Sequence, residues 1–476
     1  MRFIGPAPAH DLTYSDVFLV PSQSDVSSRF DVSLDSGDGS GMSTPVVSAN
    51  MNSVTGPRLA ATMARRGGLG VIPQDLPLSE LAAAVRAVKG QSPTYDTPFA
   101  ASPDRSVAEV LRELPPVEGH GVVVSDERGY LGFVASSELA HALPDAPIGD
   151  LVRTSTAIDA DDVTTPRQVF DLLTEAGLEV VPVMRHGHIV GTISRRSALR
   201  STIYQPNIDE QGRLRVAVAL GIRGNLVEKA AALVEAGVDV LVVDTAHGHQ
   251  RGTLDALREV RDANLGVPVV AGNVVTAQGA ADLIEAGANI VKVGVGPGAM
   301  CTTRMMTAVG RPQFSAVLEC AAAARSLGGH VWADGGVRHP RDIALGLAAG
   351  ASAVMVGSWF AGTIEAPGEL RRDASGRLFK ESWGMASAKA VSARFAKLDA
   401  YELARKEMFA EGISSSSVLL DPLRPSVEDL LDMITTGVRS SFTYAGARSL
   451  AEFWDRAVAG VQSAAGYEEG KARSIV

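Results

Sequence analysis

Eight short apolar runs, each followed by a turn and a helical pattern, constrain the fold of this chain more than any other feature. Most gaps between the ends of successive runs are roughly 20 to 40 residues long, as a barrel of eight parallel strands requires. The sequence therefore predicts an α/β fold, a (β/α)8 TIM barrel. The expected strands end near Ser48, Ile72, Leu220, Val243, Gly272, Val293, Ala333 and Val356.

The gap between Ile72 and Leu220 is too long for a single helix and predicts an inserted domain. An internal repeat lies inside it, because residues 129–139 match residues 187–199 and each copy follows a β-rich run. The sequence thus predicts three parts. They are a first barrel part over residues 1–92, an inserted domain over 93–203, and a second barrel part over 204–476 that is helical from about Val427.

Composition limits the class of protein. A chain of 476 residues, 46% of them hydrophobic, can bury a large core. Its net charge of −10 argues against nucleic-acid binding, which needs a basic surface. No apolar run is long enough to span a membrane and the first residues do not resemble a signal peptide, so we expect a soluble, cytoplasmic protein. The two cysteines fit a reducing compartment.

One cysteine, Cys301, lies on a loop that directly follows an apolar strand. Three glycines and one proline within residues 294–298 allow the loop to fold tightly around a ligand or an ion. Cys320 instead lies in the apolar run 314–322, as a packed cysteine would. The sequence therefore predicts that Cys301 is a nucleophile and that Cys320 is structural.

The loop from Gly294 to Arg304 resembles the active-site loop of the IMP dehydrogenase and GMP reductase family. Further matches follow the family's order along the chain, at residues 12–21, 48–55, 333–336, 356–358 and 383–385. The resemblance implies that the substrate is a purine nucleotide, GMP or IMP. It also implies that Cys301 attacks C2 of the purine and forms a thioimidate.

Each copy of the internal repeat resembles a CBS motif, so residues 93–203 resemble the tandem CBS (Bateman) domain of many family members. Pairs of this kind often bind purine nucleotides such as ATP and GTP between the copies, which implies regulation by these effectors. The alternative is a pair that has lost its ligand and only supports assembly. The family also implies a homotetramer or an octamer.

The resemblance assigns substrate contacts to the loops at the carboxyl ends of the strands, where such barrels bind their ligands. An aspartate would bind the ribose hydroxyls, glycine-rich turns after the last two strands would hold the phosphate, and the loop after the first strand and the start of a flap would contact the purine. The ribose contact is Asp334. The phosphate contacts are Gly335, Gly336, Gly357 and Ser358, and the purine contacts are Ser48, Asn50, Met51, Gly384 and Met385.

Cofactor and metal positions follow from the same resemblance. The nicotinamide side of the site is expected at Asp244, Thr245, Ala246, Asn273 and Gly294. The backbone carbonyls of Gly296, Gly298 and Cys301 resemble the family's potassium site, whose other oxygens come from a neighbouring subunit.

Two residues depart from the family pattern. Ala299 stands where many relatives have a serine that bonds the phosphate, and a hydrogen bond to a charged group is worth about 1.5 to 3 kcal/mol. Asn52 stands where relatives usually have an aspartate.

The two activities of the family share the thioimidate and differ in the groups that leave and arrive. A dehydrogenase passes a hydride from IMP to NAD and hydrolyses the adduct, with an Arg-Tyr pair of the flap as the base. A reductase releases ammonia from GMP and adds a hydride from NADPH, which yields IMP for purine salvage.

The Arg-Tyr pair is absent here, and Arg394 with Phe395 is the nearest candidate. Segments 310–321, 369–373 and 442–447 also favour a reductase, with Thr303 and Glu411 as the acid-base pair for departing ammonia. Segment 244–249 and the CBS pair instead resemble IMP dehydrogenases. A dehydrogenase and a catalytically silent nucleotide sensor are therefore kept as alternatives.

Overall fold

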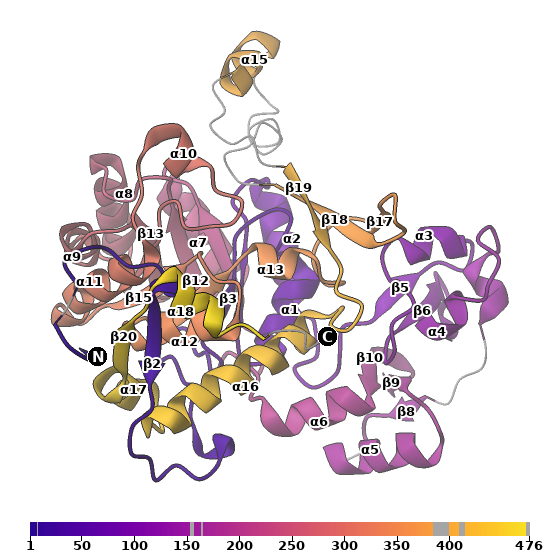
Figure 1. The fold of residues 1–476 in the computed structure, drawn as a ribbon. Helices are drawn as coiled ribbons and strands as arrows, with labels where there is room; N and C mark the ends of the chain where they lie inside the picture. Colours follow the sequence, from indigo (N-terminus) through magenta and orange to yellow (C-terminus); the bar gives the residue numbers. More distant parts are fainter. Residues whose placement is uncertain (7, 153–156, 163–164, 384–398, 409–414, 473–476) are drawn as a thin grey trace.

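The computed structural model describes residues 1–6, 8–152, 157–162, 165–383, 399–408 and 415–472. Eight parallel strands form a closed barrel at its centre (Figure 1). Each strand ends at or within two residues of its expected position, so the predicted barrel is confirmed. In order around the barrel, the strands are β11 (Ala217–Leu220), β12 (Val240–Asp244), β13 (Val269–Val274), β14 (Ile290–Val293), β15 (His330–Asp334), β16 (Ala353–Val356), β3 (Val46–Ser48) and β4 (Leu69–Ile72).

Helices cover the outside of the barrel, and each packs on the next around the ring. Side-chain caps fix where some of them begin. Asn225 accepts a hydrogen bond from the Glu228 amide, and Thr276 accepts one from the Gly279 amide. The helices are α1 (Pro57–Arg65), α2 (Leu78–Lys89), α7 (Leu226–Glu235), α8 (Arg251–Asp262), α9 (Ala277–Ala286), α11 (Gln313–Ser326) and α12 (Pro340–Ala348).

Two apolar layers hold the barrel together. The larger lies between the strands and the surrounding helices, and it includes Cys320, which is fully buried on α11 as expected. The smaller fills the barrel interior with side chains such as Val242, Ile290 and Trp332. Because these side chains point inward at alternate positions of the strands, the last inward position of each strand reaches the mouth of the barrel.

A strand near the C-terminus joins the N-terminal segment in a small sheet. β20 (Val458–Val461) pairs with β1 (Arg2–Phe3) on one side and with β2 (Val17–Val20) on the other. The helical C-terminal region begins as expected with α16 (Val427–Ala445), and α17 (Leu450–Arg456) and α18 (Ala464–Glu469) follow. The apolar pattern of α17 extends to Val458 in the sequence, but this residue starts β20 instead.

Residues 93–203 form two similar units beside the barrel (Figure 1). In each unit a short strand pairs in parallel with the first strand of an antiparallel hairpin, so the sequence repeat is also a structural repeat. The first unit has β5 (Phe99–Ala101), β6 (Gly121–Asp126) and β7 (Gly129–Ala135), with α3 (Val107–Leu111) and α4 (Ser136–Leu139); the second has β8 (Ile158–Asp159), β9 (Val180–Arg185) and β10 (His188–Ser194), with α5 (Pro166–Glu175) and α6 (Arg195–Ile203).

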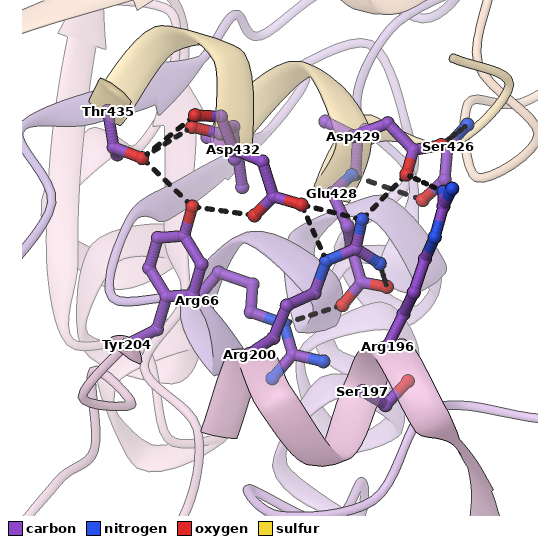
Figure 2. Close-up of polar contacts among 12 residues, drawn as sticks. Arg66, Arg196, Ser197, Arg200, Tyr204, Ser426, Glu428, Asp429, Asp432 and Thr435 are labelled. Atoms are coloured by element: carbon purple, nitrogen blue, oxygen red, sulfur yellow. Dashed lines mark hydrogen bonds and ion pairs between the residues drawn. The ribbon is translucent and has the colours of Figure 1, made fainter. Parts of the chain in front are cut away.

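The second repeat unit contacts α16 through charges. Arg200 on α6 lies 3.1 Å from Glu428, 2.6 Å from Asp429 and 2.8 Å from Asp432, all on α16 (Figure 2). Arg66, just after α1, approaches Glu428 at 2.6 Å. The side chains of Arg66, Arg200 and Glu428 are 1%, 6% and 5% exposed, so this ionic cluster is largely shielded from water.

A small sheet extends from the mouth of the barrel. It consists of β17 (Arg371–Arg372), β18 (Leu378–Trp383) and β19 (Ser415–Leu419), and α15 (Ala400–Met408) lies between the last two strands in sequence. The predicted site residues Gly384, Met385 and Glu411 lie outside the described residues. None of the described helices is long and apolar enough to cross a membrane.

Candidate active site

Four polar residues from consecutive strands meet at the mouth of the barrel. The Lys292 ammonium on β14 lies 2.9 Å from the carboxylate of Asp244 at the end of β12 and 2.7 Å from that of Asp334 at the end of β15. Asn273 on β13 donates to the same Asp334 carboxylate at 2.9 Å. From across the barrel, Asn50 donates to Asp244 at 2.7 Å. The structure thus brings together four residues predicted for the cofactor and substrate sides, and Lys292 bridges two of them, Asp244 and Asp334.

Lys292 was not among the site residues predicted from the sequence. Its side chain is only 4% exposed. Burial acts against the charged form, but the carboxylates of Asp244 and Asp334 outweigh it and raise the lysine's pKa above its ordinary value. A lysine inside a strand that is otherwise Ile290, Val291 and Val293 was a visible signal, because buried lysines need partners.

The loop that carries Cys301 starts directly after β14 and packs against the end of β15. A side chain at Gly294 would put its Cβ 2.1 Å from the Asp334 carbonyl oxygen, so the close approach of the two strand ends requires glycine here. Cys301 donates its amide to Gly298 at 3.0 Å, which closes a turn. The cysteine itself is exposed, as a nucleophile must be.

The Cys301 thiol has a hydroxyl beside it. Thr303 is the first residue of the short helix α10 (Thr303–Thr307), and its Oγ1 lies 3.2 Å from the Cys301 Sγ. These two predicted catalytic residues are therefore in contact. The third, Glu411, is among the residues that the structure does not describe.

Of the two glycine turns predicted for the phosphate, the one after β15 lies next to this loop. Gly335 and Gly336 have φ angles of +88° and +80°, and a Cβ on either would come within 3.3 Å of the loop at Gly298 or Pro297. Gly357 and Ser358 open the short helix α13 (Ser358–Ala361). Backbone amides in such turns can approach an anion closely because no side chain intervenes.

The predicted purine contacts after β3 are partly used within the protein. Ser48 is fully buried and its hydroxyl accepts a hydrogen bond from Thr55 at 2.9 Å, while Asn50 is 4% exposed and donates to Asp244. Met51 is partly exposed, and its sulfur lies 3.2 Å from where a Cβ on Gly357 would be. A substrate contact through these residues stays a prediction.

Asn52, one of the two departures from the family pattern, has a structural explanation. Its amide donates to Asp75 at 3.3 Å. An aspartate at position 52 would place a second carboxylate against Asp75, which is unfavourable without a cation. The structure gives no comparable account of Ala299.

The cofactor side of the mouth offers unused hydrogen-bonding capacity. The loop after β12 is fixed to β13, since Thr245 donates both its amide and its hydroxyl to the Gly272 carbonyl, at 2.9 and 3.0 Å. Asn273 donates its amide to the Gly294 carbonyl at 2.6 Å, while its own buried Oδ1 has no hydrogen-bond partner in the described part of the chain. This oxygen fits a donor such as the carboxamide of a nicotinamide.

A family model described as an IMP dehydrogenase / GMP reductase domain matches residues 11–473. The chain belongs to this family. A GMP reductase of Mycobacterium tuberculosis is 55% identical over 473 residues, which cover 99% of this chain and 98% of that protein. An inosine-5'-monophosphate dehydrogenase of Aquifex aeolicus is 39% identical over 474 residues, which cover 98% of this chain and 95% of that protein.

A solved structure of this IMP dehydrogenase/GMP reductase family has a similar fold. It is the GMP reductase of Trypanosoma brucei in complex with guanosine 5'-monophosphate, which matches with a TM-score of 0.69 and 30% sequence identity over 99% of each chain. The predicted family membership is thus confirmed over nearly the whole chain.

Proposed function

We propose that this protein is a GMP reductase that converts GMP and NADPH into IMP, ammonia and NADP. The 55% identity to a GMP reductase over 99% of the chain carries the proposal, since the similar dehydrogenase is 39% identical over the same length. The absence of the Arg-Tyr pair from the sequence between Met385 and Glu411 supports it, because a dehydrogenase needs that pair for hydrolysis. Such a reductase would serve cytoplasmic purine salvage.

In the first step the Cys301 thiolate forms a bond to C2 of GMP, and the bond between C2 and the amino group breaks. The leaving amine takes a proton and departs as ammonia, which leaves the thioimidate on Cys301. Thr303, whose hydroxyl lies 3.2 Å from the sulfur, would pass this proton from Glu411. In the second step C2 gains a hydride, the bond to sulfur breaks, and IMP is released.

NADPH supplies this hydride when it is bound. Asp244, Thr245, Ala246, Asn273 and Gly294 would hold its nicotinamide end, and the free Oδ1 of Asn273 is the acceptor that such a ring needs. This side of the mouth adjoins the Cys301 loop, because the Asn273 amide is bonded to Gly294 at the start of that loop.

The substrate would lie between the loop and the two glycine turns. Asp334 would accept from the ribose hydroxyls, and Gly335, Gly336, Gly357 and Ser358 would surround the phosphate. The purine would contact Gly384, Met385 and the segment after β3. Potassium would bind the carbonyl oxygens of Gly296, Gly298 and Cys301, the hard ligands that such a cation prefers, in a tetramer or an octamer.

Regulation by ATP or GTP at the CBS pair is part of the proposal. Arg200 on α6, the last helix of the pair, is held by three carboxylates of α16, and α16 packs on barrel helices α1 and α12. A nucleotide that moves α6 must therefore move or break this cluster. It gives the CBS pair a physical route to the barrel.

Two deletions test this regulation. The pair enters and leaves the barrel side by side, because Asp96 and Thr192 exchange backbone hydrogen bonds of 2.8 and 3.0 Å. Deleting residues 99–190 keeps this bridge and α6, whereas deleting 93–203 removes both. Both variants, closed by a short flexible linker, should lose any response to ATP or GTP while keeping reductase activity. A response that survives both deletions would place the effector in the barrel.

Product analysis tests the reaction. The full-length protein incubated with GMP and NADPH should release one IMP and one ammonia for each NADPH oxidised. Conversion of IMP to XMP with NAD, without any reduction of GMP, would instead establish the dehydrogenase that segment 244–249 resembles. Failure of both reactions, with retained nucleotide binding, would establish the silent sensor.

A further inference from the structure

Lys292 lies in a row of residues that crosses three strands of the barrel. Strand register pairs Asp244 with Gly272, and Gly272 with Lys292. A Cβ on Gly272 would lie 2.7 Å from the Cβ of Lys292. Glycine at this position therefore leaves the space through which the lysine reaches Asp244, two strands away.

The lysine contacts the opposite side of the site equally closely. Its ammonium lies 2.7 Å from Oδ2 of Asp334, and Asn273 donates to the same oxygen at 2.9 Å. Neither of these two contacts involves the other oxygen of Asp334, Oδ1. Lys292 and Asn273 thus occupy one oxygen of Asp334 and leave one acceptor for a ligand.

The charges at the mouth need this cation. Asp244 and Asp334 are only 19% and 22% exposed, so water solvates them incompletely. Two partly buried carboxylates repel each other unless a cation lies between them. Lys292 is the only basic side chain paired with either carboxylate in the described part of the chain.

We propose that Lys292 is a positioning residue that sets both halves of the active site at once. Through Asp334 it orients the acceptor for the ribose of GMP, and through Asp244 it fixes the loop that faces the nicotinamide. This inference rests on the proposed function for the identity of the two ligands. It assigns Lys292 no contact with the reacting atoms.

The chain contains a matched control at the opposite end of β12, the strand that ends with Asp244. Lys89 is also buried between two aspartates, 2.9 Å from Asp209 and 2.7 Å from Asp239. Asp239 comes directly before β12, whereas Asp244 ends it. A variant at Lys89 therefore loses a lysine of the same kind, but far from the mouth of the barrel.

The experiment compares Lys292→Met, Lys292→Arg and Lys89→Met in the full-length protein. Calorimetry gives the Kd for GMP without cofactor, steady-state kinetics give the KM for NADPH, and thermal unfolding gives the melting temperature. Lys292→Met should raise both constants by about tenfold or more, the size of one lost charged hydrogen bond. Lys292→Arg, which keeps the charge, should recover most of this loss. Lys89→Met should lower the melting temperature but leave both constants within about twofold.

Three results would overturn the inference. The first is a folded Lys292→Met protein with the wild-type Kd for GMP and KM for NADPH. The others are a Lys292→Arg protein in which both constants rise as much as in Lys292→Met, and a Lys89→Met protein in which they rise equally. If Lys292→Met does not fold, Lys292→Gln replaces it, because Gln keeps a donor of similar length without the charge; it should raise both constants about threefold or more.

GMP binding does not require turnover. A wild-type protein that binds GMP without reducing it would therefore contradict the proposed function and leave the role of Lys292 testable.

Discussion

The thiol of Cys301 lies 3.2 Å from the hydroxyl of Thr303, on an exposed loop whose path is fixed by the ends of β14 and β15. In the proposed reaction these two residues are the nucleophile and a proton carrier, which act where the bound purine would present C2. The contact joins two residues that the proposed reaction uses in the same step.

Replacement of Cys301 by serine should abolish turnover and spare GMP binding, because a hydroxyl is a far weaker nucleophile than a thiolate near neutral pH. Steady-state rates and calorimetry measure the two effects. Cys320→Ala is the control, since Cys320 is fully buried and burial, with the nearby Glu319, raises its pKa to about 12. Activity of Cys301→Ser above a few per cent of wild type would contradict the covalent mechanism.

Loss of the Thr303 hydroxyl should slow ammonia release more than hydride transfer. Thr303→Val and Glu411→Gln should both reduce the rate of GMP reduction by roughly a hundredfold, the lower range for general acid catalysis. The same variants given IMP and NADP run only the hydride step backwards, and there the loss should be much smaller. Equal losses in the two assays would assign these residues to structure or binding.

Asn52→Asp should destabilise the protein, because the new carboxylate would face Asp75 in place of the present 3.3 Å hydrogen bond. The double variant Asn52→Asp with Asp75→Asn reverses the pair and should recover most of the loss. Thermal unfolding of the two single variants and the double variant gives the coupling energy, expected at about 1 kcal/mol. Additive effects would show that the pair does not interact.

Glu428→Gln should lower the free energy of unfolding by about 3 kcal/mol near neutral pH, because it leaves buried Arg66 and Arg200 without their shared carboxylate. The exposed pair Arg167–Asp171 supplies the control. Asp171→Asn should change stability by less than about 1 kcal/mol. Urea unfolding measures both variants.

The effect of Glu428 should also depend on pH. Burial disfavours its charged form, but Arg66, Arg200 and Arg65 outweigh burial and lower its pKa to about 2, from 4.5 in an unfolded chain. A lowered carboxylate pKa stabilises the fold above the unfolded value. The advantage of wild type over Glu428→Gln should therefore be complete above pH 4.5 and shrink as the pH falls towards 2. An advantage that stays constant over this range would contradict the ion pairing.

The sequence predicted the barrel well, because the strands are short, mostly apolar runs and most of them end at or directly before a glycine or a polar residue such as Asp334. It could not predict how Lys292 joins Asp244 and Asp334, since this depends on the register of strands β12 to β15. The charge inside an apolar strand was visible, but its partners were not.

The ionic cluster of Arg66, Arg200 and the α16 carboxylates could not be predicted from the sequence either. Arg200 and Glu428 are 228 residues apart, and nothing local to either shows that α6 packs against α16. Asn52 is a similar case, because its departure from the family pattern became explicable only when Asp75 was found beside it.

Reduction of GMP is the activity proposed for this member of the family. One preparation of the full-length protein should be given GMP with NADPH and, separately, IMP with NAD, while the near-ultraviolet absorbance of the reduced nicotinamide is followed. A GMP reductase should lower the absorbance in the first mixture and leave it constant in the second. A rise with IMP and NAD, and no fall with GMP and NADPH, would contradict it.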